Sequence, residues 1–280
     1  MIKLKGVARR IVSFTLRKLF NPLYRRAKVR GFPWAVSIYS FLYRRVTFLG
    51  LYEPGTVVLL KELLKEGMTF LDLGAYRGYY TVLASKLVGE KGRVFAFEPA
   101  PENFALLKAN LQGRKNVSLI QKAVSNKVRT GKLFLASFGS SAHRIYDADE
   151  GKESVDVEVT SLDEFFKDKD AKIDVIKMDI EGAEMSALEG MANIIKKNEN
   201  LRLITEFVPW YFQPLDSLPE SFLRKLVEYG FKLYLINDDK ETVEPVTIDD
   251  LMRLGQDYKD YSRRNLFCEK GAFETTIGSE

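Results

Sequence analysis

From residue 68 onward, short apolar stretches of strand length alternate with longer stretches of helical pattern. The strand-like stretches are almost continuously apolar, which is typical of a parallel sheet buried on both faces. They lie at 69–73, 93–98, 117–121, 173–179, 201–207, 231–236 and 265–269. The pattern therefore predicts an α/β Rossmann-like fold, with a mostly parallel sheet and helices on both faces.

The predicted helices connect these strands, and two of them carry capping signals. Ser161 with Glu164, and Ser217 with Glu220, form the S-x-x-E pattern that starts a helix. Two further stretches, 132–136 and 154–160, interrupt the alternation and predict an inserted hairpin. The last two strands are separated by one short helix and are expected to pair antiparallel. The predicted helices lie at 56–66, 78–88, 101–112 and 183–196, with another ending at Gly230.

The counts of metal-binding and redox residues exclude several classes of protein. The chain has one cysteine, Cys268, and one histidine, His143. An internal disulfide, a cysteine-based zinc site and a three-histidine metal site are therefore excluded within one chain. A single cysteine is typical of a protein that works in the reducing cytoplasm. No apolar run is long enough for a transmembrane helix.

The first 52 residues form a strongly basic arm. They contain twelve lysines and arginines and no acidic residue, so a chain of net charge +5 leaves −7 on the remainder (5 − 12 = −7). Residues 7–20 predict an amphipathic basic helix. The charge shift near Pro54 predicts two domains, 1–54 and 55–280. The arm (1–45) is expected to bind an anionic membrane surface, to cover the active site or a dimer partner, or to bind nucleic acid.

The stretch "FLDLGAYRGYY", 70–80, places Asp72 at a strand end and follows it with Gly74 and Gly78. Ligands of open parallel sheets bind beyond such strand ends. Tyr76 stands where a dinucleotide loop has its second glycine, and a carboxylate in that loop repels pyrophosphate. S-adenosylmethionine fits better, because its ammonium suits a carboxylate. Glu98, which ends the next strand, can accept hydrogen bonds from ribose hydroxyls.

The same motifs resemble those of FkbM-type S-adenosylmethionine-dependent methyltransferases. The resemblance covers about 55–270 and implies a class I methyltransferase fold, whose seven-stranded sheet has an antiparallel final strand. It also implies methylation of hydroxyl groups on sugars, glycans or other natural products. One departure is Tyr76, where the family usually has a small polar residue. The resemblance rests on "FLDLGAYRGYYT", "VFAFEPAPENFALLKAN", "QKAVSN", "SLDEF" and "DVIKMDIEGAEMSALEG".

Residue by residue, the resemblance implies a cofactor site along the strand ends. The methionine end is assigned to the first loop, the ribose to Glu98 with Pro99 shaping its turn, and adenine to Ala123 and Val124. The full predicted set is Asp72, Gly74, Ala75, Tyr76, Gly78, Glu98, Pro99, Ala123, Val124 and Asp179.

A hydroxyl acceptor needs a base, or a metal that lowers its pKa. Asp179 and Glu181 stand two residues apart at a strand end, Glu206 ends the next strand, and His143 lies in the inserted hairpin region. These four are the predicted catalytic residues. Glu184 is interpreted as favouring a helix N-terminus. No ligand spacing predicts a metal site.

The sequence thus predicts O-methylation of a sugar, glycan, lipid-linked or natural-product hydroxyl by a cytoplasmic enzyme, peripheral to the membrane if the arm binds lipid. The inserted loops 130–160 and 208–220 are expected to shape the acceptor pocket. Three alternatives stay open: a nucleic-acid methyltransferase that uses the arm, a nicotinamide-dependent oxidoreductase and a non-catalytic binding protein. The first is disfavoured by "DIEG", 179–182, where amino-methyltransferases of nucleic acids carry an N-P-P-Y-like tetrapeptide.

Overall fold

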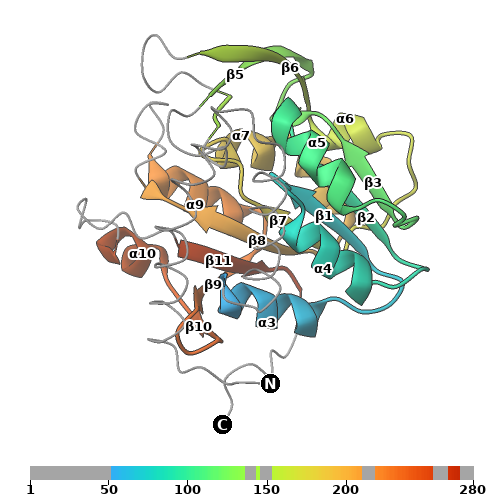
Figure 1. Ribbon diagram of the computed structural model, residues 1–280. Coiled ribbons are helices and arrows are strands. Elements are labelled where there is room, and N and C mark those ends of the chain that lie inside the picture. Colours follow the sequence, from blue (N-terminus) through green and yellow to red (C-terminus); the bar gives the residue numbers. More distant parts are fainter. Residues whose placement is uncertain (1–51, 136–142, 146–152, 210–217, 255–263, 272–280) are drawn as a thin grey trace, which may run out of the picture. The chain divides into compact units, whose positions relative to one another are not determined.

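The computed structural model describes residues 52–135, 143–145, 153–209, 218–254 and 264–271 (Figure 1). Two compact units are distinguished: Met1–Val58 with Asn237–Glu241, and Leu59–Ile236 with Thr242–Glu280. Both sheets, apart from Asn237 at the end of β9, and the candidate site belong to the second unit. Residues 1–51 of the predicted basic arm lie outside the described residues, so the boundary between residues 54 and 55 stays a prediction.

The main sheet has eight strands in the order β10-β9-β11-β8-β7-β1-β2-β3. Strands β3, β2, β1, β7 and β8 are parallel, and β11 runs antiparallel to both β8 and β9, as the sequence predicted. The bounds are β1 Thr69–Leu73, β2 Arg93–Phe97, β3 Val117–Ile120, β7 Val175–Met178, β8 Arg202–Phe207, β9 Lys232–Asn237, β10 Thr242–Pro245 and β11 Arg264–Glu269.

The strand count differs from the predicted seven because β10 adds a strand at the edge of the sheet. Its sequence, TVEP, is short and ends in proline. Proline cannot donate a ladder hydrogen bond, so such a stretch is tolerated at a sheet edge and gives a weak strand signal.

The predicted inserted hairpin is confirmed and belongs to a second, three-stranded sheet of order β4-β6-β5. Strand β5 (Arg129–Phe134) pairs antiparallel with β6 (Ser154–Thr160). The two-residue strand β4 (Ala123–Val124) pairs parallel with β6 and was not predicted. The small sheet thereby holds the segment that follows β3 in a fixed place.

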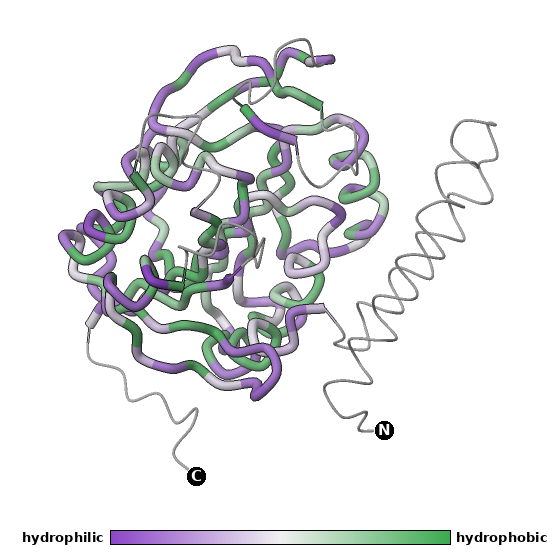
Figure 2. Tube along the Cα trace, turned by 90° about the vertical axis from the view of Figure 1, so that its left-hand side faces the viewer, coloured by the Kyte–Doolittle hydropathy of each residue, from purple (hydrophilic) through white to green (hydrophobic). Residues whose placement is uncertain are grey.

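Helices cover both faces of the main sheet. On one face, Leu71 and Phe95 pack with Phe166 and Leu188 in the main core. On the other, Ala96 packs with Leu107. Figure 2 shows apolar residues, in green, recurring along the inner segments. The helices are α3 Pro54–Leu63, α4 Tyr79–Leu87, α5 Pro101–Asn110, α6 Leu162–Phe166, α7 Glu184–Glu189, α8 Ala192–Lys197, α9 Pro219–Glu228 and α10 Ile248–Leu254.

Two helix predictions differ from the structure. The stretch predicted as one helix, 183–196, is two helices, α7 and α8, with Gly190 between them. A Cβ at Gly190 would lie 2.1 Å from the carbonyl oxygen of Ser125, so this close approach of two backbones requires glycine. Helix α9 begins at Pro219 with Leu218 at its N-cap, and Ser217 lies outside the described residues.

The other capping prediction is confirmed, because the Ser161 hydroxyl accepts a hydrogen bond from the Glu164 backbone N–H at 3.2 Å. Among the described helices, none combines the length and the apolar character that crossing a membrane requires.

The loop after β1 lies directly against the end of β7. Gly74 has a φ of +83°, and a Cβ there would lie 1.9 Å from the backbone oxygen of Asp179. Any side chain at this position would therefore push the two strand ends apart. The sheet edge can therefore have this geometry only with a glycine at position 74.

We expect Gly74→Ala to destabilise the protein more than Gly67→Ala does. Both glycines have a backbone φ in the left-handed region, but a Cβ at Gly67 would meet nothing within 4 Å. The left-handed strain alone costs about 1–2 kcal/mol, and the backbone clash at Gly74 should add about 2 kcal/mol or more. Urea unfolding of both variants measures the difference, and equal losses would contradict this account of the edge.

Candidate functional site

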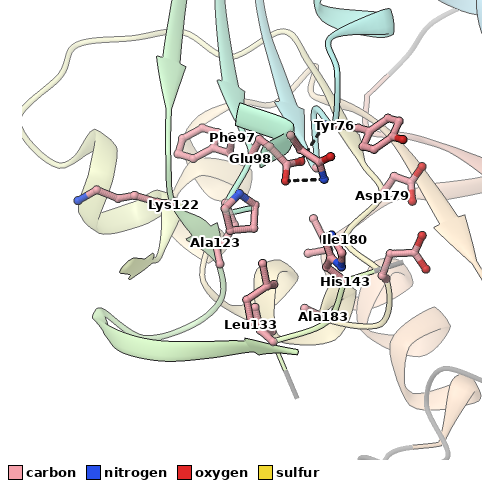
Figure 3. Close-up of a pocket in the computed structure, with 16 residues that line it drawn as sticks. Tyr76, Phe97, Glu98, Lys122, Ala123, Leu133, His143, Asp179, Ile180 and Ala183 are labelled. Atoms are coloured by element: carbon pink, nitrogen blue, oxygen red, sulfur yellow. Dashed lines mark hydrogen bonds between the residues drawn. The ribbon is translucent and has the colours of Figure 1, made fainter. Parts of the chain in front are cut away.

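A cavity opens at the carboxyl ends of β1, β2 and β7, with about 540 Å³ of empty space including the part that is open to solvent (Figure 3). The main sheet and the small sheet both contribute to its wall. The residues that line it are Gly74, Tyr76, Phe97, Glu98, Pro99, Asn103, Lys122, Ala123, Val124, Leu133, His143, Ile145, Asp179, Ile180, Glu181 and Ala183. Most of the predicted cofactor residues therefore lie around one cavity.

The first loop is tied to the end of β2. The backbone N–H groups of Gly74 and Ala75 donate to the carbonyl oxygen of Phe97 at 3.0 and 2.9 Å. Gly78, with a φ of +89°, is the N-cap of α4, and a Cβ there would lie 2.7 Å from Leu107 of α5. Gly78 and Ala75 thus shape the loop and its helix packing without lining the cavity.

Tyr76 is a non-glycine residue with positive φ, 51°. Its backbone N–H donates to Glu98 Oε2 at 2.8 Å, and its ring lies 4.8 Å from the Arg77 guanidinium carbon. This conformation is uncommon for a large side chain. The residue at which the sequence departs from the family pattern is therefore also a residue held in an unusual backbone conformation at the cavity wall.

Glu98 is a buried carboxylate at the cavity, held by neighbouring backbone. Its Oε1 accepts from the Ala100 N–H at 3.0 Å and from the Asn103 amide at 3.4 Å. Burial raises its pKa to about 7, although the hydrogen bonds from Ala100 and Tyr76 oppose the rise. A carboxylate fixed in this way can accept hydrogen bonds from the hydroxyls of a bound ribose.

Asp72 lies behind the cavity wall. Its Oδ2 accepts a 2.5 Å hydrogen bond from the Thr81 hydroxyl of α4. Burial raises its pKa to about 6, and the positive charge of Lys177 opposes the rise. Asp72 is not among the cavity-lining residues. The structure therefore places it beneath the loop, where it connects β1, α4 and β7.

Lys177 is a charged residue in the middle of a buried strand, and the sequence reasoning assigned it no role. Its ammonium lies 3.2 Å from Asp179 Oδ2, and its side chain is 2% exposed against 20% for Asp179. A lysine within the otherwise apolar strand VIKM was the available signal, because buried lysines are rare unless paired.

The three predicted catalytic carboxylates lie close together at the strand ends. Carboxylate oxygens of Asp179, Glu181 and Glu206 all lie within 4.8 Å of one another. Glu181 and Glu206 are buried. Asp179 and Glu181 also line the cavity, whereas Glu206 does not. A group of this kind can accept hydrogen bonds from hydroxyls, take up a proton or hold a divalent cation.

The fourth predicted catalytic residue, His143, lies apart from this group in the sequence but lines the same cavity, with Leu133 and Ile145. Glu184 has a structural place, because its Oε1 accepts the Ile180 backbone N–H at 3.1 Å. Burial raises the Glu184 pKa to about 8. Glu184 is the first residue of α7, as the sequence indicated, but its raised pKa leaves it protonated at neutral pH. It therefore contributes through this hydrogen bond and not through a charge at the helix N-terminus.

The family model described as "Methyltransferase FkbM domain" matches residues 72–233, which is more than half of the chain. The chain belongs to the FkbM methyltransferase family. The match begins at Asp72, within the last two residues of β1, and includes the whole of β2 and β7. An FkbM methyltransferase takes its methyl group from S-adenosylmethionine, and the glycine loop and the buried Glu98 of this chain fit that cofactor.

Curated relatives are also methyltransferases. The chain is 28% identical over 123 residues to a protein-L-isoaspartate O-methyltransferase of Methanococcoides burtonii. The matched stretch covers 42% of this chain and 58% of that protein. It is 28% identical over 146 residues to the hexuronic acid methyltransferase AglP of Haloferax volcanii, covering 51% and 58%. The chain thus spans less than two thirds of the length of either relative.

Among solved structures, fibrillarin of Aeropyrum pernix with bound S-adenosylmethionine is similar, with a TM-score of 0.42 and 14% identity over 76% of this chain and 73% of that one. A SAM-dependent methyltransferase of Aquifex aeolicus gives a TM-score of 0.40 and 19% identity, over 76% and 88%.

We expect Glu98→Gln to weaken binding of S-adenosylhomocysteine about tenfold, because a charged hydrogen-bond acceptor for the ribose is lost. In the wild type, affinity should fall as the pH drops below about 7, where Glu98 takes up a proton. Calorimetric titration measures both effects. The matched control is Asp174→Asn, which changes a buried carboxylate that directly precedes β7 and accepts the Thr69 N–H. Equal losses of affinity in both variants would contradict this placement of the ribose.

The raised pKa of Glu184 also predicts a pH dependence of stability. The folded protein holds a proton at this carboxyl up to about pH 8, whereas the ordinary value is 4.5. The folded state therefore binds more protons between these values, and stability falls as the pH rises through them. Glu184→Gln should reduce this slope. Urea midpoints from pH 5 to 8 measure it, and an unchanged slope in the variant would contradict the assignment.

Proposed function

We propose that this FkbM methyltransferase transfers the methyl group of S-adenosylmethionine to a hydroxyl oxygen of a saccharide or glycan. The observation that carries the proposal is the group of three carboxylates, Asp179, Glu181 and Glu206, at the edge of the cofactor cavity. Carboxylate oxygens accept hydrogen bonds from hydroxyls, and saccharides are rich in hydroxyls.

The cofactor has a clear orientation in this proposal. Ala123, Val124 and Leu133 supply an apolar wall for adenine, and Glu98 accepts the ribose hydroxyls. The methionine end extends along Gly74 and Tyr76 toward Asp179. Asp72, Ala75 and Gly78 support this loop from behind, and Pro99 shapes the turn beside the ribose.

The three carboxylates of Asp179, Glu181 and Glu206 supply the chemistry that hydroxyl methylation requires. The sulfur–carbon bond of the donor breaks as the new carbon–oxygen bond forms, and the hydroxyl proton must go to a base. We assign this base to Glu206. It does not line the cavity itself, but it is buried within 4.8 Å of the two carboxylates that do, so the proton reaches it through Glu181. Asp179 holds the donor ammonium and Glu181 holds the acceptor hydroxyl. The hydroxyl oxygen, the methyl carbon and the sulfur are thereby kept in line, so much of the rate gain comes from positioning.

The acceptor class is supported by a relative. The Haloferax volcanii protein is named as a hexuronic acid methyltransferase, and it matches half of this chain. The family match disfavours the nicotinamide-dependent alternative, and "DIEG" still argues against a nucleic-acid amine acceptor.

The experiment is a methyl-transfer assay with labelled S-adenosylmethionine. A panel of neutral glycosides, hexuronic acid glycosides and short RNA serves as acceptors, and NMR of the product locates the new methyl group. The proposal predicts label on a saccharide oxygen. Label on RNA, or on a nitrogen or carbon atom, would contradict it.

We expect Glu206→Gln to lower the turnover number by about 10² or more, because the base is removed from the reaction. The dissociation constant for S-adenosylhomocysteine should change little. Glu269→Gln is the matched control, since Glu269 is also buried but lies at the other end of the pairing between β11 and β8. Full turnover in Glu206→Gln would rule out Glu206 as the base.

A further inference from the structure

Lys177 is buried at the junction of three elements. Its Cα pairs with that of Asp72 across β1 and β7. Since side chains two residues apart on a strand share a face, Asp72, Lys177 and Asp179 lie on one face of the sheet. Helix α4 covers this face, because the Thr81 hydroxyl bonds to Asp72 and the Tyr80 ring lies 4.6 Å from the Lys177 ammonium.

The electrostatic setting is unusual for a buried lysine. In the described part of the chain, the buried basic side chains are Arg77 and Lys177. Lys177 stands between the carboxylate of Asp72, which lies beneath the loop, and that of Asp179, which lines the cavity. Taking a charge out of water is costly unless a partner offsets it. An apolar residue would fill the same space, so the charge itself needs an explanation.

The Asp179 carboxylate supplies this explanation. Lys177 approaches its Oδ2 from the buried side, and Asp179 remains 20% exposed at the cavity. A carboxylate held by a fixed cation on one oxygen keeps one orientation, which is the condition for directing a ligand.

We propose that Lys177 is a positioning residue that fixes the Asp179 carboxylate toward the donor ammonium in the cofactor cavity. This inference rests on the proposed function, in which Asp179 meets the methionine end of the cofactor. Lys177 does not touch the cofactor in this account, and acts through Asp179. Its ammonium also offsets the electrostatic repulsion that Asp179 exerts on Asp72.

The test measures S-adenosylhomocysteine dissociation constants by calorimetry for Lys177→Met, Lys177→Arg, Asp179→Asn and the double variant Lys177→Met with Asp179→Asn. We expect Lys177→Met to weaken binding about tenfold, and Lys177→Arg to recover part of this loss. In the Asp179→Asn background, Lys177→Met should change binding less than about twofold, because the residue through which it acts is gone.

The matched control is Lys172→Met, which removes an exposed lysine whose ammonium lies 2.8 Å from Asp174. It should leave binding unchanged. Circular dichroism at the assay temperature establishes that each variant is folded, and a Lys177→Met variant that does not fold is replaced by Lys177→Gln.

Unchanged or tighter binding of S-adenosylhomocysteine by Lys177→Met would overturn the proposal. That result is expected if Lys177 only competes with the donor ammonium for the Asp179 carboxylate. Losses that multiply in the double variant would overturn it as well, as would an arginine variant no better than the methionine variant. Each of these results would leave the proposed methyl transfer standing, because that is judged by product formation in the wild type.

Discussion

The close approach between the first loop and the end of β7 is the constraint on which the rest of the site depends. The backbone at Gly74 leaves no room for a Cβ beside the Asp179 carbonyl. Because the loop is also hydrogen-bonded to the end of β2, three strand ends are fixed relative to one another. The cavity wall, the buried Glu98 and the cavity-lining Asp179 all follow from this arrangement.

The same edge concentrates buried carboxyl groups that are shielded from water. Burial raises the pKa of Asp72, Glu98 and Glu184, which is the pattern that functional sites share. Lys177 stands on the face where β1 and β7 meet α4, and it offsets part of this negative charge. The site therefore combines rigid backbone with carboxylates whose protonation depends on their neighbours, and both properties serve a reaction that orients two substrates and moves one proton.

The strand-and-helix order and the residues at strand ends could be predicted because each depends on local pattern. Asp72, Glu98 and Asp179 all stand where a buried strand stops, and periodicity locates such positions well. Other features depend on contacts between distant segments. Glu206 lies close to Asp179 and Glu181 because β8 pairs with β7. The helical stretch is divided at Gly190 because the backbone there lies against that of Ser125. The pattern did not show that Asp72 faces α4, since that depends on Thr81.

A crystal structure with bound S-adenosylhomocysteine would show how the cofactor lies relative to the strand ends. We expect the ribose hydroxyls on Glu98, adenine against Ala123 and Val124, and the sulfur directed toward the group formed by Asp179, Glu181 and Glu206. A sulfur that points away from this group, or a ribose that lies away from Glu98, would show that the cofactor is bound in another way.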